Sequence, residues 1–233
     1  MFPTVEIRWF KRGQAPQEVV AWFHHGEGRV DRRPQRVDHY LTIRPPGTLS
    51  VKFREGRIEV KQRFLRREPI RFHQRVTGIV EHWRKWSFEL ANAPRACAGV
   101  GTPAGVATPA GSWTPVRKER RLLTYRLTAD RRVVPATAPS PHSNARDQGC
   151  VMELTAVVAA EQDWWTLAFE AFGDESGLED VLLDVARAVL RAREPPVLNA
   201  AESRGYAHWL RMAAEDEGCV APMDVGRSRR WQN

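Results

Sequence analysis

The sequence has few cysteines and no long apolar run. Its three cysteines are widely separated among 233 residues, so a disulfide framework and a zinc-ligand spacing are both excluded. No apolar run approaches the ~20 residues that a membrane helix needs. The amino-terminal residues MFPTVEIRWFKRG also lack the apolar core of a signal peptide. These absences predict a cytoplasmic protein with reduced thiols at Cys97, Cys150 and Cys219.

Two classes of motif are absent as well. The chain has no glycine-rich phosphate loop of a nucleotide-binding fold and no recognition helix of a DNA-reading motif. Positive charge, by contrast, is abundant: 36 Lys and Arg oppose 28 Asp and Glu, which gives a net charge of +8. This balance favours an anionic partner, whether a nucleic acid, a phosphate ester or an acidic surface.

Alternating patterns predict a series of β-strands. In LSVKFREGRIEVKQR (49–63), apolar and charged residues alternate on both sides of a turn near Glu55–Gly56, as in a hairpin with one cationic face. Amphipathic helices are expected at 16–25 and 176–193. The other expected strands are 3–10, 37–43, 80–90, 113–127, 150–158 and 164–172. Consecutive strands with helices near both ends predict an α+β protein with a closed or nearly closed antiparallel barrel.

Composition also suggests how the chain is divided. Residues 91–112 are rich in Ala, Gly, Pro and Thr, and 134–149 are similarly aperiodic, so both are expected to be flexible loops. We expect a barrel domain over 1–195, followed by a carboxy-terminal extension over 196–233 that ends in a basic tail. The oligomeric state does not follow from the sequence.

Pairs of cations recur on single strand faces, and single acids occur in the last two strands. Lys52 and Arg54 form one pair, Lys118 and Arg120 another, while Glu153 and Glu170 lie among apolar neighbours. Each feature alone is typical of a solvated sheet face or an ordinary ion pair. Together, in a closed barrel, such residues would converge on a polar lumen. Cations for phosphate oxygens and carboxylates for a divalent metal are what phosphoryl transfer requires.

The order of these segments resembles the CYTH, or triphosphate tunnel metalloenzyme, superfamily. The segments are TVEIRWF, VDHYL, LSVKFREG, RIEVKQR and VRKERRL, followed by the two late acids, and they cover roughly residues 4–192. The resemblance implies an eight-stranded antiparallel β-tunnel with covering helices, whose charged residues point inward around a triphosphate. Members of this superfamily include thiamine triphosphatases, inorganic triphosphatases, adenylyl cyclases and RNA triphosphatases.

The resemblance also implies roles for individual residues. Glu6, Glu153 and Glu170 match acids that hold Mg²⁺ or Mn²⁺. Two acids of the family pattern are missing, because Thr4 and Ala168 occupy their positions. The phosphate-binding side is more complete. Its matches are Arg8, Lys52, Arg54, Lys61, Lys118 and Arg120, and Arg63 is a less close match to the position of Lys61.

Three functions follow from this reading. The first is metal-dependent hydrolysis of a triphosphate or polyphosphate inside the tunnel. The alternative is a catalytically weak or silent tunnel that binds polyphosphate or a nucleotide, since the loss of two carboxylates weakens metal binding. The third, ranked below both, is a nucleic-acid or protein-interaction module that uses an arginine-rich exterior. The organic part of a substrate and the catalytic residues cannot be assigned from the sequence.

Overall fold

The structure is a computed structural model that describes residues 1–41, 47–90, 113–136 and 148–218, with side chains described through Ala213. Eight antiparallel strands close into a barrel, in the order β10-β11-β1-β7-β4-β3-β2-β8, because β8 also pairs with β10. The predicted α+β class and closed eight-stranded architecture are therefore confirmed. The barrel strands are β1 (Phe2–Arg12), β2 (Asp31–Leu41), β3 (Leu49–Arg54), β4 (Arg57–Arg66), β7 (Glu81–Glu89), β8 (Trp113–Leu127), β10 (Gly149–Ala159) and β11 (Gln162–Phe172).

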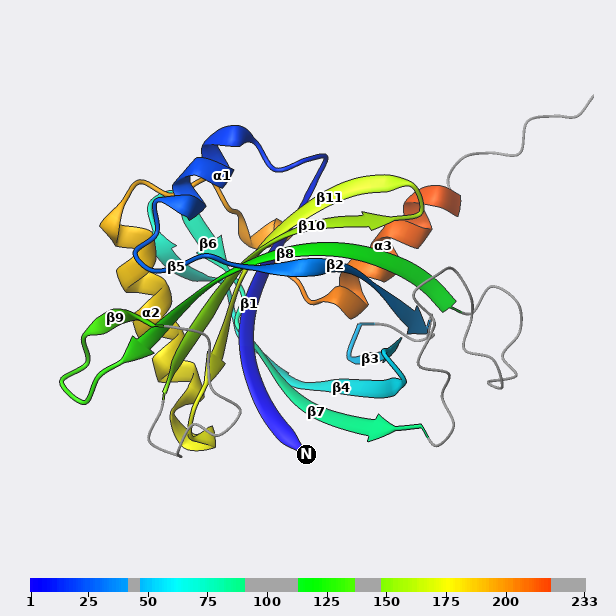
Figure 1. Cartoon of the computed structure of the whole chain (residues 1–233), viewed down its shortest axis with the longest axis horizontal. Coiled ribbons are helices and arrows are strands. Elements are labelled where there is room, and N and C mark those ends of the chain that lie inside the picture. The colour runs from blue at the N-terminus through cyan, green and yellow to red at the C-terminus, as the bar shows by residue number, and fades with distance from the viewer. Residues whose placement is uncertain (42–46, 91–112, 137–147, 219–233) are drawn as a thin grey trace, which may run out of the picture.

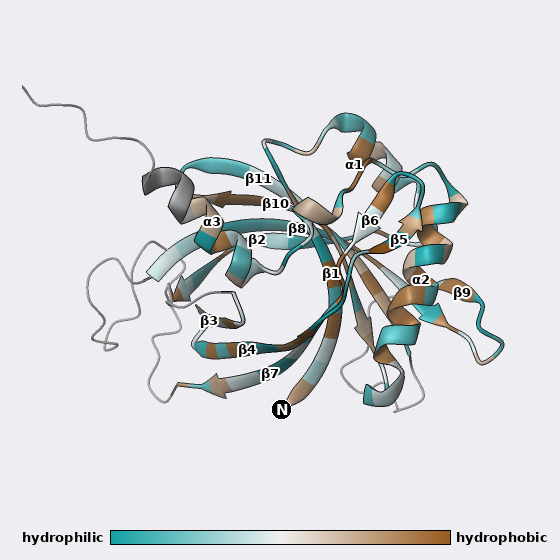
Figure 2. Ribbon diagram, turned by 180° about the vertical axis from the view of Figure 1, so that it is seen from behind, coloured by the Kyte–Doolittle hydropathy of each residue, from teal (hydrophilic) through white to brown (hydrophobic). Residues whose placement is uncertain are grey.

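The apolar face of several strands points outward, toward helices. Val5, Ile7 and Trp9 of β1 are buried in the main hydrophobic core, whereas Glu6 and Arg8 between them face the lumen. The helices α1 (Gln17–His24) and α2 (Leu178–Ala192) pack on this outer face. In Figure 2, α2 carries alternating hydrophobic and hydrophilic stripes, as a helix buried on one side should. The barrel wall is thus covered on this side, which leaves polar residues for its interior.

The hairpin between β3 and β4 turns where the sequence predicts. Arg54 pairs with Arg57, and the two residues between them, Glu55 and Gly56, have φ angles of 49° and 75°. Two consecutive positive φ angles are typical of a type I′ turn, whose twist matches that of the flanking strands. This turn fixes the register of the hairpin and therefore the face on which Lys52 and Arg54 lie.

Several element bounds differ from the prediction. The strand expected at 37–43 begins earlier, at Asp31, where it pairs with Leu122 of β8. Residues 134–136 of the expected loop belong to β9 (Val133–Ala136), which pairs with the end of β8, and Gly149 begins β10. Residues 137–147 and 91–112 of the two expected loops lie outside the described residues. A short hairpin of β5 (Ile70–His73) and β6 (Val76–Gly78) was not predicted, because its strands are too short to show a period.

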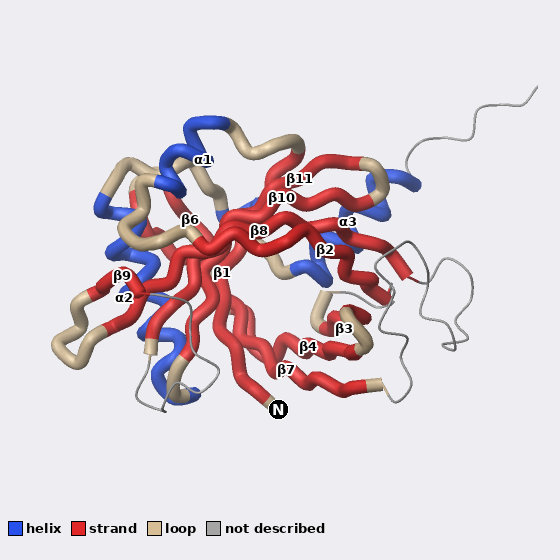
Figure 3. Tube along the Cα trace, in the orientation of Figure 1, coloured by secondary structure: helices blue, strands red, loops and turns tan. Residues whose placement is uncertain are grey.

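The chain after α2 returns to the barrel. A 3₁₀ turn, η1 (Glu175–Gly177), precedes α2, and in the described region the chain after α2 forms a second one, η2 (Ala200–Glu202), and then α3 (Tyr206–Gly218). The Arg204 amide donates to the Arg8 carbonyl at 2.9 Å, and Lys11 forms an ion pair with Glu202 at 2.9 Å. Figures 1 and 3 show α1 and α2 on one side of the barrel and α3 on the other. No helix in the described part of the chain is long and apolar enough to cross a membrane.

Candidate functional site

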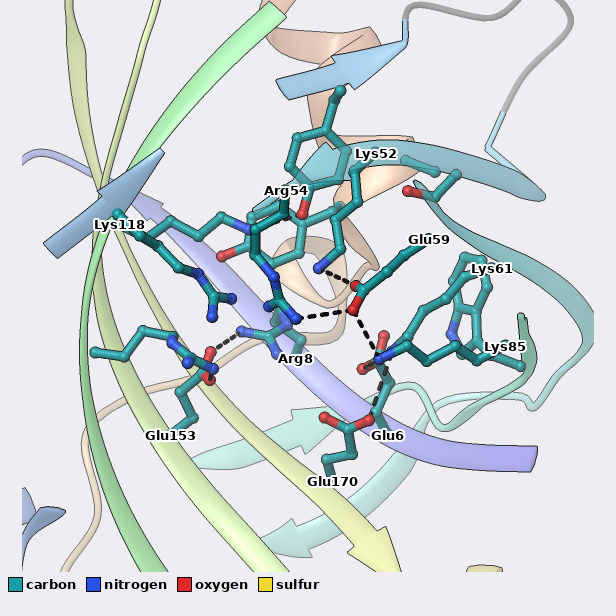
Figure 4. A pocket seen from close by; sticks show the side chains of 17 residues that line it. Glu6, Arg8, Lys52, Arg54, Glu59, Lys61, Lys85, Lys118, Glu153 and Glu170 are labelled. Atoms are coloured by element: carbon teal, nitrogen blue, oxygen red, sulfur yellow. Dashed lines mark hydrogen bonds and ion pairs between the residues drawn. The ribbon is translucent and has the colours of Figure 1, made fainter. Parts of the chain in front are cut away.

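A charged cavity of about 150 Å³ lies inside the barrel (Figure 4). Among the described residues, eight cations and four carboxylates line it, so its wall has a net positive charge. The cations come from β1, β2, β3, β4, β7 and β8, which means that nearly every strand contributes. The charged lining residues are Arg8, Arg36, Lys52, Arg54, Lys61, Lys85, Lys118, Arg120, Glu6, Glu59, Glu153 and Glu170.

Nine of the ten residues singled out from the sequence line this cavity. The exception is Arg63, whose guanidinium bonds to Glu81 and lies 5.7 Å from the Trp83 ring. Arg63 is in register with Trp83 of β7, and the register of the two strands shifts only beyond it, between Arg63 and Leu65. Arg63 therefore neutralises a buried carboxylate beside the cavity, and its predicted contact with substrate does not follow from this geometry.

Asp38 contacts three cations of the cavity wall. Its carboxylate is fully buried and lies 3.0 Å from the Lys118 Nζ, 3.6 Å from the Lys52 Nζ and 3.2 Å from the Arg36 Nε. Burial alone would raise the pKa of Asp38, but the three cations lower it well below its usual range. Asp38 is therefore ionised, and one negative charge is shared by three positive ones.

The single charge of Asp38 therefore does not balance the positive charges of the lysines around it. Burial and the neighbouring cations lower the pKa of Lys118 well below its ordinary value, although Asp38 acts in the opposite direction. The pKa of Lys52 is lowered for the same reason, burial being the largest cause. An anion placed beside these lysines would favour their charged forms. An additional negative group would therefore be stabilised in this part of the cavity.

Glu59 of β4 also contacts three cations, which come from the neighbouring strands β3 and β7. It accepts from Lys52 at 2.6 Å and from Arg54 at 2.8 Å, and it lies 3.3 Å from Lys85. Burial would raise its pKa, but these cations lower the pKa of Glu59 to about 2. Glu59 was not predicted as a site residue, although it shares a face with Lys61 in RIEVKQR. Asp38, Arg36 and Lys85 were missed as well.

Glu153 of β10 is fixed by hydrogen bonds from three neighbouring side chains. It accepts from the Arg8 guanidinium at 2.8 Å, from the Thr155 hydroxyl at 2.8 Å and from Arg120 at 3.3 Å. Burial would raise its pKa, yet Arg8 and Arg120 lower the pKa of Glu153 to about 2. Glu6 and Glu170, paired in register on β1 and β11, share Lys61 at 3.3 and 3.5 Å. Every carboxylate of the wall is therefore already engaged by at least one cation.

This arrangement does not fit a preformed metal site. Glu6, Glu153 and Glu170, the predicted ligands, each bond to a cation. Within the described ranges, no three His, Cys, Asp or Glu side chains are grouped closely enough to hold an ion. Ala168 lies in register between Arg8 and Glu153, and its methyl side chain adds no carboxylate there. With eight cations against four carboxylates among the described lining residues, the cations are the dominant feature of the site.

Aromatic rings form the floor of the cavity. Tyr206 of α3 stacks on Tyr40 with ring centroids 5.6 Å apart, and the Lys118 Nζ lies 3.6 Å from the Tyr206 centroid. Tyr40 accepts a hydrogen bond from Lys118 at 2.7 Å. The buried Tyr206 hydroxyl has no hydrogen-bond partner among the described residues. Burial raises the pKa of Tyr206, so this hydroxyl keeps its proton and is a potential donor to a ligand.

Comparisons with known proteins do not assign the chain to a family. A scan against protein-family models finds no match, and a search of curated proteins finds no significantly similar one. The function must therefore be argued from the chemistry of the cavity.

Proposed function

We propose that this protein is a CYTH-like tunnel that binds a triphosphate or polyphosphate in its lumen. The observation that carries the proposal is the excess of cations over carboxylates on the cavity wall, eight against four among the described residues. Hydrogen bonds from Lys and Arg to phosphate oxygens are charge-assisted and about twice as strong as neutral ones. A multivalent anion would supply the negative charge that Asp38, Glu59, Glu153, Glu6 and Glu170 supply only in part.

The enclosure of the cations favours a small ligand over a nucleic acid. A cavity of about 150 Å³ admits a short phosphate chain, whereas a duplex, whose major groove alone is ~12 Å wide, cannot enter it. Several exterior arginines are ion-paired, for example Arg67 with Glu179 and Arg75 with Glu194. The third hypothesis, a nucleic-acid module, therefore has less support from the described surface.

Hydrolysis is the second candidate, and one observation favours it. Glu6 and Glu170 lie side by side on adjacent strands and share the single cation Lys61. If Lys61 bonded to a phosphate instead, two adjacent carboxylates would be released from their shared cation. Carboxylate oxygens of this kind are ligands for Mg²⁺ or Mn²⁺, the predicted cofactors. The assay is phosphate release from tripolyphosphate, thiamine triphosphate and nucleoside triphosphates with each ion.

The test of binding compares two arginines on one strand. Arg120 lines the cavity, whereas Arg117, three residues away on β8, is exposed on the outer face. Loss of a charge-assisted contact costs ~1.5–3 kcal/mol, so Arg120→Ala should weaken tripolyphosphate binding roughly ten- to a hundredfold. Arg117→Ala should change it less than twofold. Calorimetry without metal measures both, and equal effects of the two substitutions, or no binding by the wild type, would contradict the proposal.

A further inference from the structure

The lumen changes from charged to apolar toward one end. Residues two apart on a strand share a face, so Phe10 follows Arg8, and Tyr40 follows Asp38, along lumen-facing rows. Val116 likewise precedes Lys118 on β8, and Val157 follows Thr155 on β10. These apolar residues lie at the same end, since Ala159 pairs with Val116 and all of them belong to one buried cluster. One end of the barrel interior is therefore built to be filled by apolar groups.

Helix α3 fills that end. Trp209 is buried in one cluster with Phe10, Tyr40, Val116 and Val157, and its ring stacks on that of Phe10 at 4.7 Å. Tyr206, Leu210 and Ala213, from successive turns of α3, pack against the same cluster. Gly205 allows the approach, because a Cβ at this position would lie 2.7 Å from the Trp83 ring.

The exposure of the charged residues follows the same axis. Asp38 and Lys118, next to α3, have side-chain exposures of 0% and 3%. At the opposite end, the side chains of Lys85 and Glu170 are 30% and 41% exposed. Solvent, and with it any ligand, therefore reaches the cavity from the end that bears Lys85 and Glu170.

We infer that the cavity is a blind cup that takes the free end of a linear phosphate chain, with the terminal phosphate innermost. This inference rests on the proposed function and specifies the substrate class. The deepest groups are the cations around Asp38 and the unpartnered Tyr206 hydroxyl, and a terminal phosphate carries more charge than an internal one, since its second pKa is ≈ 6. Arg54, Arg120 and Lys61 line the route from there toward the mouth.

The substrate class then has two requirements. One end of the chain must be an unsubstituted phosphate, because α3 leaves no exit for a group attached there. The other end carries any organic part, which would lie at the mouth beyond Glu170. Linear tripolyphosphate and nucleoside triphosphates satisfy both requirements. Cyclic trimetaphosphate and a dinucleoside triphosphate, whose chain is esterified at both ends, do not.

Calorimetric titration without metal tests the inference. Tripolyphosphate and ATP should bind one per protein, whereas diadenosine triphosphate and trimetaphosphate should bind at least a hundredfold more weakly. Long linear polyphosphate should bind no more than two protein molecules per chain, whatever its length, because a chain has two ends. A protein count that rises with chain length, or equal affinity for the doubly esterified ligand, would overturn the blind cup alone. Absence of tripolyphosphate binding would instead overturn the proposed function, and the inference with it.

A variant of α3 gives a second test. Trp209→Ala removes the largest group that fills the apolar end, so diadenosine triphosphate should gain affinity relative to ATP by about tenfold or more. Circular dichroism and thermal unfolding establish that the variant folds. Unchanged discrimination in a folded variant would show that α3 does not determine it. If the variant does not fold, the number of wild-type molecules bound per polyphosphate chain still decides between a blind and an open lumen.

Discussion

At the scale of single residues, three carboxylates of the lumen, Asp38, Glu59 and Glu153, each contact more than one cation. Asp38 contacts Lys118, Lys52 and Arg36, while Glu59 contacts Lys52 and Arg54. Without these acids the cations of the wall would repel one another in a low-dielectric interior. The acids therefore reduce the repulsion among the cations, while the wall keeps the net positive charge that an anion would bind.

Substitution of Asp38 should test this role directly. Asp38→Asn removes the shared negative charge, so Lys118 and Arg36 lose their carboxylate contact while Lys52 keeps Glu59, and the free energy of unfolding should fall by about 3–5 kcal/mol. Tripolyphosphate should restore part of the loss, since it returns negative charge to the same place. The matched control is Asp31→Asn on the same strand, whose pair with Arg33 is solvent-exposed and should be worth less than ~1 kcal/mol. Urea unfolding with and without ligand measures these differences, and similar effects of both substitutions would contradict the role.

The carboxylates also set the dependence of stability on acid. Glu59 and Glu153 have folded-state pKa values of about 2, below the ordinary value of 4.5. A depressed folded-state pKa gives stability that is present above the unfolded pKa and is lost as the pH falls through the folded one. Each group should therefore contribute on the order of 3 kcal/mol at neutral pH, lost between about pH 5 and pH 2.

This window can be measured by urea unfolding at a series of pH values. Glu153→Gln should flatten the fall in unfolding free energy between pH 5 and pH 2, because the glutamine does not titrate. Substitution of the exposed Glu55, whose pair with Arg54 is 3.9 Å long, should leave the slope unchanged. A slope as steep in Glu153→Gln as in the wild type would contradict the assignment.

At the scale of elements, two hairpin turns carry non-glycine residues in the left-handed region. Glu55 has a φ of 49° before Gly56, and Ala160 and Glu161 have φ angles of 49° and 58° between β10 and β11. Type I′ turns favour Asn and Gly at these positions, since other residues are strained there. These turns nevertheless set the register that aligns the inward-facing charges.

Relief of this strain should stabilise the protein without changing its site. Glu55→Asn and, independently, Glu161→Gly should each raise the free energy of unfolding by about 0.5–1 kcal/mol. Gly56→Ala should lower it by a similar amount, because it introduces a Cβ at a φ of 75°. Chemical denaturation measures all three. Destabilisation by Glu55→Asn would show that the charge of Glu55 matters more than its backbone geometry.

At the scale of the whole molecule, a ligand in the lumen would connect most strands of the barrel. Arg8, Arg36, Arg54, Lys61 and Arg120 belong to five different strands that are brought together only by closure. An anion that contacts several of them binds the folded state and not the unfolded chain. Binding should therefore be visible as global stabilisation.

Thermal unfolding gives the expected size of this effect. At a hundred times its Kd, tripolyphosphate should raise the free energy of unfolding by ~2.7 kcal/mol, which corresponds to a rise in Tm of about 5–11 °C for a chain of this length. Potassium chloride at matched ionic strength should give much less, and high salt should weaken the tripolyphosphate effect. Equal stabilisation by chloride and tripolyphosphate would indicate general screening rather than a site.

The sequence by itself determined the features that depend on neighbours along the chain. The period-two alternation of β1, the turn at Glu55–Gly56 and the apolar stripe of α2 are local, and all three were predicted and are present. The pairing of Lys52 with Arg54 on one face followed from the same alternation. These predictions were possible because strand faces and helix stripes repeat over a few residues.

The tertiary structure decided which charges meet and which end of the barrel is filled. Asp38 and Lys118 are 80 residues apart and meet only because β2 pairs with β8 in one particular register. The pairing of β4 with β7 brings Arg63 to Glu81, and the return of the chain after α2 places Tyr206 and Trp209 of α3 inside the barrel. Charge neutralisation and lumen packing depend on distances between remote strands, and no local pattern in the sequence encodes those distances.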